Sequence, residues 1–582
     1  MGLSSVMNSL RSMFGGGRTE GHNEKADEVQ LPVLQAVSVR DTEMPEKVSA
    51  YVLVDKSKGV IYVDRNHQFE PEIRTWVVRR SRDAENPLPT TAVDASELAQ
   101  HAARVRAESD NGLFDDDDEN RFRGRVRDML YRAGQAGASD VHIQVRPNDT
   151  VVHFVVSGES RLAESLTREE GTRALRSIYQ GLAQSTSQSY QQSEYQSAQI
   201  PGSAFPTEIG LTSIRIMRGP CYPQESDGEF MTLRMQYSGG SRKAAKTEPM
   251  PYPPKPEGHY RLAEMGFDEG QLERLDKMMA MPEGLILFVG PTGSGKTTSI
   301  FEFLSEGQRR KPYKRVITVE DPVEIPIPTA VQMSVTNAQS KEETARAYQS
   351  AVRTMLRMAP KVILIGELRD EEVAALALEA AATGHLVVAT LHVDEAFQWV
   401  DRLETMGAGK LKRLAFCDPK RVRGVITQRI LSHLCPSCSI PISELDEIPR
   451  SHRMAMSSLK TWGDISNVRV RGKGCEDCRK SGVKGRYAIA EVIETDEALM
   501  RDFVQDSTAI ARKNYRARPN AEKSMIERAI EMVLYGKVDP VVVEDNIDVI
   551  PPREKFYALP HLVSPSSEVG DQMVDALLEA RA

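Results

Sequence analysis

The stretch LILFVGPTGSGKT, residues 285–297, decides the fold of this chain. Its first five residues form an apolar run of the length expected for a buried strand, and GPTGSGKT fits the pattern G-x-x-x-x-G-K-[ST]. A helical pattern begins at Thr298. Glycines let backbone N–H groups curl around phosphate oxygens at a helix start, where the helix dipole favours negative charge. The sequence therefore predicts a phosphate-binding loop between a buried strand and a helix.

The loop contains the groups that a nucleoside triphosphate needs at its phosphates. Lys296 is expected to reach the β- and γ-phosphates, and Thr297 to place its hydroxyl on Mg²⁺. ATP and Mg²⁺ are therefore the expected ligands. The predicted nucleotide-binding residues are Gly290, Pro291, Thr292, Gly293, Ser294, Gly295, Lys296, Thr297 and Thr298.

Three more short apolar runs follow, RVITVE (315–320), KVILI (361–365) and HLVVATL (385–391), and they alternate with helical patterns. This rhythm predicts a parallel sheet flanked by helices, an α/β fold. Glu320 ends the first run, and Glu367 follows the second. Ligands bind at the carboxyl ends of such strands. We therefore expect Glu367 to orient Mg²⁺ or its water and Glu320 to polarise the attacking water.

Glu320 and two histidines of the third run can also be interpreted as ordinary structural residues. Glu320 sits in TVEDPVE, which is also the composition of a solvated turn. His385 and His392 lie at opposite ends of the third run, which is too far apart to bind one metal ion. A lone histidine on a buried strand is usually a hydrogen-bonded core residue.

Length and composition restrict the classes of protein that remain. The chain has 582 residues, 40% of them hydrophobic, and a net charge of −8. The length indicates three or four domains, and the negative charge argues against a nucleic-acid partner, which needs a cationic face. No apolar run approaches the roughly 18 residues of a membrane span, and no secretory signal is present. A cytoplasmic protein is expected.

The predicted domain order follows shifts in composition. An N-terminal amphipathic arm (1–30) precedes a small mixed α/β domain (31–107) and an acidic linker (108–121). A second, PAS-like α+β domain (122–240), a proline-rich linker (241–256), the nucleotide-binding domain (257–555) and a tail (556–582) follow. Within the second domain, the Ser/Gln-rich tract 184–199 is predicted to be a helix surface or a loop.

Four of the six cysteines form two Cys-x-x-Cys pairs, with 36 residues between the pairs. In a reducing compartment this pairing suggests a metal and not disulfides. Four thiolates suit tetrahedral structural zinc and leave no open position for catalysis. The predicted Zn²⁺ ligands are Cys435, Cys438, Cys475 and Cys478.

The motifs GPTGSGKTT, TVEDPVE, LRMAPKVILIGELRDEE and AATGHLVVATLHVDEA stand in the order and spacing of one known family. Over about residues 122–550 the chain resembles the type II secretion and type IV pilus assembly ATPases, whose Walker A, Asp box, Walker B and His box these motifs match. The resemblance implies a RecA-like core with an inserted tetracysteine segment. That segment is typical of motors that assemble pili or secrete proteins.

The resemblance also implies roles for individual residues. Glu320 becomes the catalytic carboxylate of the Asp box and Glu367 the Walker B acid, while His385 and His392 sense the γ-phosphate. Arg215 and Arg234 match arginines that the family donates into a neighbouring subunit's site. It further implies a homohexamer with nucleotide between subunits, working on a polytopic inner-membrane platform protein, with peripheral membrane association through partners.

The main alternative is the ATPase of a conjugative or type IV secretion system, which the Ser/Gln-rich tract 184–199 resembles. A RecA-like nucleic-acid translocase is a third hypothesis, and the basic clusters 309–315 and 410–423 are its support. Both clusters are explained more simply as solvated loops or faces between subunits. A scaffold without hydrolysis is disfavoured by the intact Lys296, Glu320 and Glu367.

Overall fold

The computed structural model describes residues 48–102 in part and residues 116–558 apart from 185–188, 240–248, 336–339 and 408–410. The chain divides into two compact units, 1–119 and 120–582. The predicted amphipathic arm and residues 559–582 of the tail lie outside the described residues. The finer domain boundaries stay predictions.

The first unit contains a small three-stranded sheet. β1 (Val52–Asp55) pairs antiparallel with β2 (Val60–Asp64). α2 (Pro71–Ser81) then leads to β3 (Thr90–Val93), which pairs parallel with β2. Ile61 and Ile73 are fully buried between the helix and the sheet.

α4 (Asp116–Gln135) spans the boundary between the two units, and it includes the end of the acidic run within the predicted linker 108–121. Acidic residues are favourable in the first turn of a helix because the helix dipole is positive there. The helix starts six residues before residue 122, the predicted start of the second domain.

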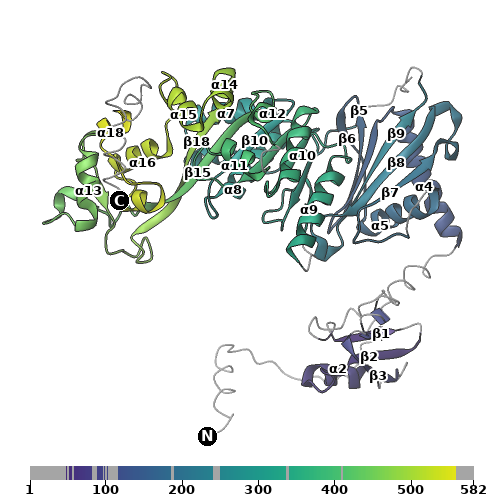
Figure 1. The fold of residues 1–582 in the computed structure, drawn as a ribbon. Coiled ribbons are helices and arrows are strands. Elements are labelled where there is room, and N and C mark those ends of the chain that lie inside the picture. Colours follow the sequence, from purple (N-terminus) through teal and green to yellow (C-terminus); the bar gives the residue numbers. More distant parts are fainter. Residues whose placement is uncertain are drawn as a thin grey trace, which may run out of the picture. The chain divides into compact units, whose positions relative to one another are not determined.

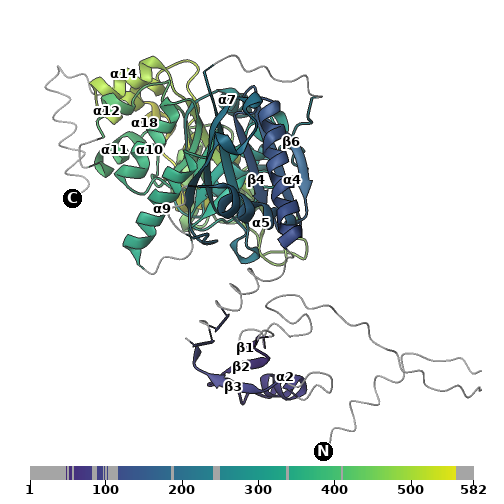
Figure 2. The ribbon, with the colours of Figure 1, turned by 90° about the vertical axis from the view of Figure 1, so that its right-hand side faces the viewer.

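A six-stranded antiparallel sheet follows, with α4 and α5 (Arg168–Arg176) packed on one face (Figures 1 and 2). Its strand order is β6-β5-β4-β9-β8-β7. The strands are β4 (Asp140–Val145), β5 (Thr150–Val156), β6 (Glu159–Leu166), β7 (Gln196–Pro201), β8 (Leu211–Pro220) and β9 (Glu229–Tyr237).

The end of the Ser/Gln-rich tract corrects a prediction. Residues 196–199 belong to the edge strand β7 and not to a helix surface or loop. Gln196, Ala198 and Ile200 are buried, and they alternate with the exposed residues Ser197 and Gln199. This period of two is that of a strand with one buried face.

The C-terminal half is built on a seven-stranded sheet, which confirms the predicted α/β fold with a RecA-like parallel core. Its order is β12-β11-β13-β14-β10-β15-β18, and every neighbouring pair is parallel except β15–β18. The strands are β10 (Gly284–Val289), β11 (Val316–Glu320), β12 (Val331–Ser334), β13 (Val362–Ile365), β14 (Leu386–Leu391), β15 (Val422–Leu434) and β18 (Val483–Glu494).

Helices cover both faces of this sheet, which explains why its strands are apolar throughout (Figure 1). Leu287 of β10 packs into one core and its neighbour Phe288 into the other. On the Leu287 side lie α9 (Lys341–Met355), α10 (Glu371–Ala382), α11 (Trp399–Met406), α12 (Arg413–Phe416), α14 (Glu497–Gln505) and α15 (Thr508–Arg516). On the Phe288 side lie α6 (Leu262–Met265), α7 (Glu269–Ala280) and α8 (Lys296–Arg310).

The ends of β15 and β18 carry a smaller subdomain with its own hydrophobic core. Its elements are α13 (Arg450–Leu459), α16 (Met525–Leu534), α17 (Pro540–Asn546), α18 (Arg553–Ala558) and the short pair β16 (Ile440–Pro441) and β17 (Arg469–Val470). Across the part of the chain that the structure describes, no helix is both long and apolar enough to cross a bilayer.

Candidate functional site

The glycine-rich loop joins the end of β10 to the start of α8. Gly290 and Gly295 adopt φ angles of 141° and 84°, a region that side chains disfavour. A Cβ atom at Gly290 would lie 2.7 Å from the carbonyl oxygen of Gln428, and one at Gly295 would lie 2.8 Å from Ile430 Cδ1. The loop conformation therefore requires glycine at both positions.

Lys296 is the first residue of α8, and its Nζ donates to the carbonyl oxygens of Gly290 and Pro291, both at 2.9 Å. Burial lowers the pKa of Lys296, while the nearby carboxylates of Glu367 and Glu324 act to raise it. The ammonium thus lies inside the loop and within the field of two acids.

The loop fits a bound triphosphate. The N–H groups in the first turn of α8 have no acceptor within the helix. Ser294 Oγ is buried and has no hydrogen-bond partner among the described residues. Thr297 is partly exposed in the same turn, one residue after Lys296. Backbone donors, a lysine and a hydroxyl are the groups that phosphates and Mg²⁺ bind in such loops.

Glu320 is the last residue of β11 and is 7% exposed. Its Oε1 accepts hydrogen bonds from Thr318 Oγ1 at 2.5 Å and from Gln332 Nε2 at 3.0 Å. Burial raises the pKa of Glu320, and the two hydrogen bonds oppose that rise. The carboxylate of Glu320 is therefore buried and fixed by hydrogen bonds, and Glu320 is not a solvated turn residue.

Glu367 follows β13 and joins groups from three strand ends. Its Oε1 lies 3.5 Å from His392 Nε2, just after β14, and its Oε2 accepts from Arg369 Nε at 2.8 Å. Arg369 also pairs with Asp321, just after β11. The carboxyl ends of β10, β11, β13 and β14 therefore meet at one edge of the sheet, because the strands are parallel.

His385 is not brought to this edge. It immediately precedes β14, so the whole strand separates it from His392. Its Nδ1 lies 3.1 Å from the carbonyl oxygen of Ala380 at the end of α10. Six strand residues span about 20 Å, so only one of the two histidines predicted to sense phosphate lies beside Glu367.

Three polar residues at the site were not predicted. Tyr348 Oη donates to the carbonyl oxygen of Val319 at 3.2 Å and accepts the backbone N–H of Glu367 at 3.0 Å. Gln428 Nε2 donates to the carbonyl oxygen of Ser294 in the loop at 2.7 Å. Tyr348 and Gln428 are distant in sequence from their partners, and no local sequence pattern marks them as site residues. Arg369 had one available signal, its position two residues after Glu367.

Arg215 and Arg234 are directly opposite each other on β8 and β9, and both are exposed. Arg234 Nε pairs with Asp140 Oδ1 at 3.0 Å. Among the described residues, neither arginine contacts the glycine loop or its acids within the same chain.

The four predicted cysteines come together, with all Sγ atoms within 4.8 Å of one another. Three of the Sγ–Sγ distances, 435–475, 438–478 and 475–478, are 3.8 Å. Zn–S bonds of about 2.3 Å in a tetrahedron give sulfur separations of about 3.8 Å. Backbone N–H groups of Cys475 and Gly482 donate to Cys478 Sγ and lower its pKa to about 6. The cluster fits a tetrahedral metal.

A match to a protein family covers most of this half of the chain. Residues 255–548 match the model of the family described as "Type II/IV secretion system protein". The chain belongs to this family. The match spans the glycine loop, Glu320, Glu367, His392 and the four cysteines.

Two relatives show how much of the chain is shared with members of the family. The type IV pilus assembly ATPase PilB of Thermus thermophilus is 29% identical over 76% of this chain and 45% of its own length. The type II secretion system ATPase E of Vibrio cholerae is 26% identical over 74% of this chain and 76% of its own length. The chain thus spans less than half of the Thermus relative.

Among solved structures, the pilus retraction motor PilT with bound ADP is 19% identical over 71% of this chain and 94% of that chain. Its TM-score is 0.34, which is too low to establish a shared arrangement of domains.

Proposed function

We propose that this protein is an Mg²⁺-dependent ATPase that converts ATP and water to ADP and phosphate and couples the reaction to mechanical work. The observation that carries the proposal is the meeting of the glycine loop, Glu320, Glu367 and His392 at one edge of a parallel sheet. This edge is where ligands of such sheets bind.

Each group then has a task in the reaction. The loop N–H groups and Lys296 bind the phosphates, and Thr297 supplies the protein hydroxyl to Mg²⁺, which neutralises developing charge. Glu320 accepts the proton of the attacking water. Glu367 orients the Mg²⁺ hydration shell, and His392 responds to the γ-phosphate through Glu367.

The work done is proposed to be type IV pilus assembly or type II-like protein secretion. Support comes from the family and from relatives named as ATPases of both systems. We propose a homohexamer at the cytoplasmic side of the inner membrane that acts on a polytopic platform protein, without a nucleic-acid partner. In the hexamer, Arg215 and Arg234 complete the site of the next subunit.

The four cysteines are proposed to hold one structural Zn²⁺. The near-tetrahedral spacing of their sulfur atoms supports this, and four thiolates leave no open coordination position. The metal would stabilise the subdomain at the ends of β15 and β18 and take no part in hydrolysis.

Two variants of the purified full chain separate binding from chemistry. Lys296→Ala should abolish binding of a fluorescent ATP analogue, whereas Glu320→Gln should bind it normally and lose about 100-fold or more in phosphate release. Lys277→Ala, an exposed lysine on α7, is the control and should behave as wild type. Phosphate release by Glu320→Gln at the wild-type rate would contradict the proposed base.

A further inference from the structure

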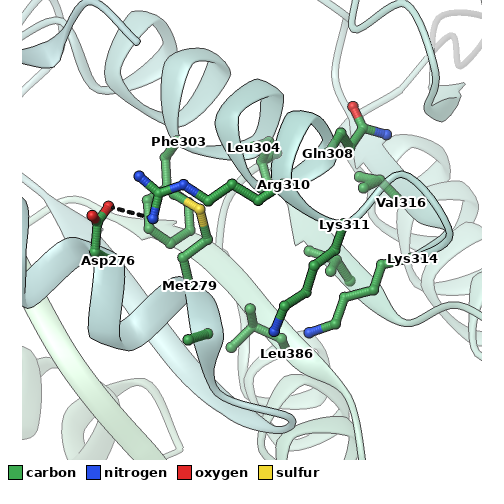
Figure 3. Close-up of a pocket in the computed structure, with 13 residues that line it drawn as sticks. Asp276, Met279, Phe303, Leu304, Gln308, Arg310, Lys311, Lys314, Val316 and Leu386 are labelled. Carbon is green, nitrogen blue, oxygen red and sulfur yellow. Dashed lines mark ion pairs between the residues drawn. The ribbon is translucent and has the colours of Figure 1, made fainter. Parts of the chain in front are cut away.

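A second concave site lies at the opposite edge of the same sheet, where β11, β13 and β14 begin (Figure 3). The cavity has a volume of about 60 Å³. Its walls come from α7, from the C-terminal half of α8 and from the loop after α8. Residues that bear on its chemistry are Met279, Phe303, Leu386, Arg310, Lys311 and Lys314.

This cavity is separate from the nucleotide site. α8 starts at Lys296 in the glycine loop and ends at Arg310 beside the cavity. A helix of 15 residues is about 22 Å long. A ligand in the cavity would therefore contact none of the phosphate-binding groups.

Two of the three cations at the cavity have no counter-charge among the described residues. Arg310 pairs with Asp276 at 3.0 Å and with Glu306 at 2.7 Å. For Lys311 and Lys314, by contrast, the structure shows no ion pair with any described acid. Figure 3 shows both ammonium groups close together beside Leu386.

The electrostatic setting of Lys314 favours an anion. It is partly buried, and burial together with the positive charges of Lys311 and Lys361 lowers its pKa. Charged groups out of water are costly unless an opposite charge is present. An anion between the two ammonium groups would relieve both the repulsion and the desolvation.

The interior of the cavity is apolar. Met279, Phe303 and Leu386 are buried on its walls, as are Leu304, Val316 and Val362. An apolar cavity of about 150 Å³ holds benzene. A cavity of about 60 Å³ therefore takes a group that is smaller than benzene.

We propose that this cavity is a binding site for a short-chain aliphatic carboxylate. The alkyl group of this ligand enters the apolar interior, and its carboxylate lies between Lys311 and Lys314. The proposal is independent of ATP hydrolysis, because none of the residues involved belongs to the nucleotide site.

Calorimetry on the full chain, without nucleotide, tests the proposal with three probes. 3-Methylbutanoate carries both the alkyl group and the charge, 3-methylbutanamide lacks the charge, and acetate lacks the alkyl group. We expect 3-methylbutanoate to bind at least about tenfold more tightly than either of the others, since each lacks one of the two contacts. Equal affinity for the acid and the amide, or no binding of the acid, would overturn the proposal.

Variants then assign the binding to this cavity. Lys311→Met with Lys314→Met removes the charges, and Gly307→Ala places a methyl group in the cavity wall, 3.4 Å from Met279 Cγ. Both should weaken binding about tenfold or more, and Lys277→Met on α7 should not. Unchanged binding in the lysine pair would overturn the site. The site would also be overturned if the wild-type chain does not bind the acid and the lysine pair variant no longer forms the hexamer. The two lysines would then contact another subunit and not a ligand.

Discussion

Glu320 is held through one of its two carboxylate oxygens. Thr318 and Gln332 both donate to Oε1, and Oε2 takes part in neither bond. A general base works only when it is unprotonated. Because burial raises the pKa of Glu320, the rate of hydrolysis should begin to fall at a higher pH than it would with an exposed glutamate.

Thr318→Val should move that acidic limb further toward neutral pH. The substitution removes a donor that stabilises the charged form of Glu320 but keeps a β-branched side chain in the strand. The measurement is the pH profile of kcat. Thr427→Val is the matched control, because Thr427 Oγ1 is buried on β15 and has no hydrogen-bond partner in the part of the chain that the structure describes. An identical profile in wild type and Thr318→Val would rule out Glu320 as the titrating base.

At this scale, sequence patterns predict residues that lie next to a strand end and miss those that arrive from elsewhere. Glu320 and Glu367 lie at or just after the ends of apolar runs, and Lys296 lies in the loop motif that follows another. The parallel topology brings the three together. Tyr348 and Gln428 reach the site from residues far along the chain, so no local spacing marks them.

Among the elements, α9 is the helix that Tyr348 links to two strands of the site. One hydroxyl bonds the carbonyl oxygen of Val319 near the end of β11 and the N–H of Glu367 just after β13. The spacing between the two catalytic acids thus depends on a helix that carries neither of them.

Tyr348→Phe should therefore reduce kcat by about tenfold and the free energy of unfolding by about 1–3 kcal/mol, because it leaves the backbone N–H of Glu367 unsatisfied. The carbonyl oxygen of Val319 still accepts from the N–H of Gly366 at 2.8 Å. KM for ATP should change much less, since the glycine loop is untouched. Tyr260→Phe is the control. The hydroxyl of Tyr260 is buried and has no hydrogen-bond partner among the residues described, so its loss should not destabilise the fold. Equal kcat in the two variants would show that the hydroxyl of Tyr348 does not position Glu367.

The sequence predicted central strands better than edge strands. Four of the five central strands of the ATPase sheet, β10, β11, β13 and β14, were marked by apolar runs, because both of their faces are buried. The fifth, β15, was not predicted. β6 and β7, at the two edges of the second-domain sheet, are built from polar residues, and only alternate positions of β7 are buried. Composition hides such a strand even when its periodicity is regular.

For the whole molecule, the proposal that Arg215 and Arg234 complete the site of the next subunit predicts that two inactive variants complement each other. A 1:1 mixture of the Lys296→Ala chain with the double variant Arg215→Ala/Arg234→Ala should recover activity that each alone lacks. Random mixing makes about one quarter of the interfaces complete. ATPase assays on reconstituted mixtures measure this.

Two results bear on that experiment. Arg125→Ala, an exposed arginine of the same domain, should keep wild-type activity and serves as the control. Absence of recovery in a mixture that demonstrably contains hybrid rings would mean that the arginines act within their own subunit or not at all.

Zinc removal is the second prediction at this scale. Elemental analysis should find about one zinc per chain, and Cys435→Ser should lose it. The same variant should lower Tm, because the thiolates join the loops after β15 and before β18. Cys417→Ala should keep the metal, since Cys417 is a buried cysteine outside the cluster, and burial raises its pKa to about 12. Full zinc content in Cys435→Ser would exclude a four-cysteine site.

β15 extends from the glycine loop to the tetracysteine cluster of the C-terminal half. Gln428, in its middle, holds the glycine loop, and Cys435 follows the last residue of the strand. The two residues are about 23 Å apart at strand spacing. A tilt of about 10° at Gln428 would move Cys435 by about 4 Å. A change in the shape of the glycine loop would then appear as a displacement of the tetracysteine cluster.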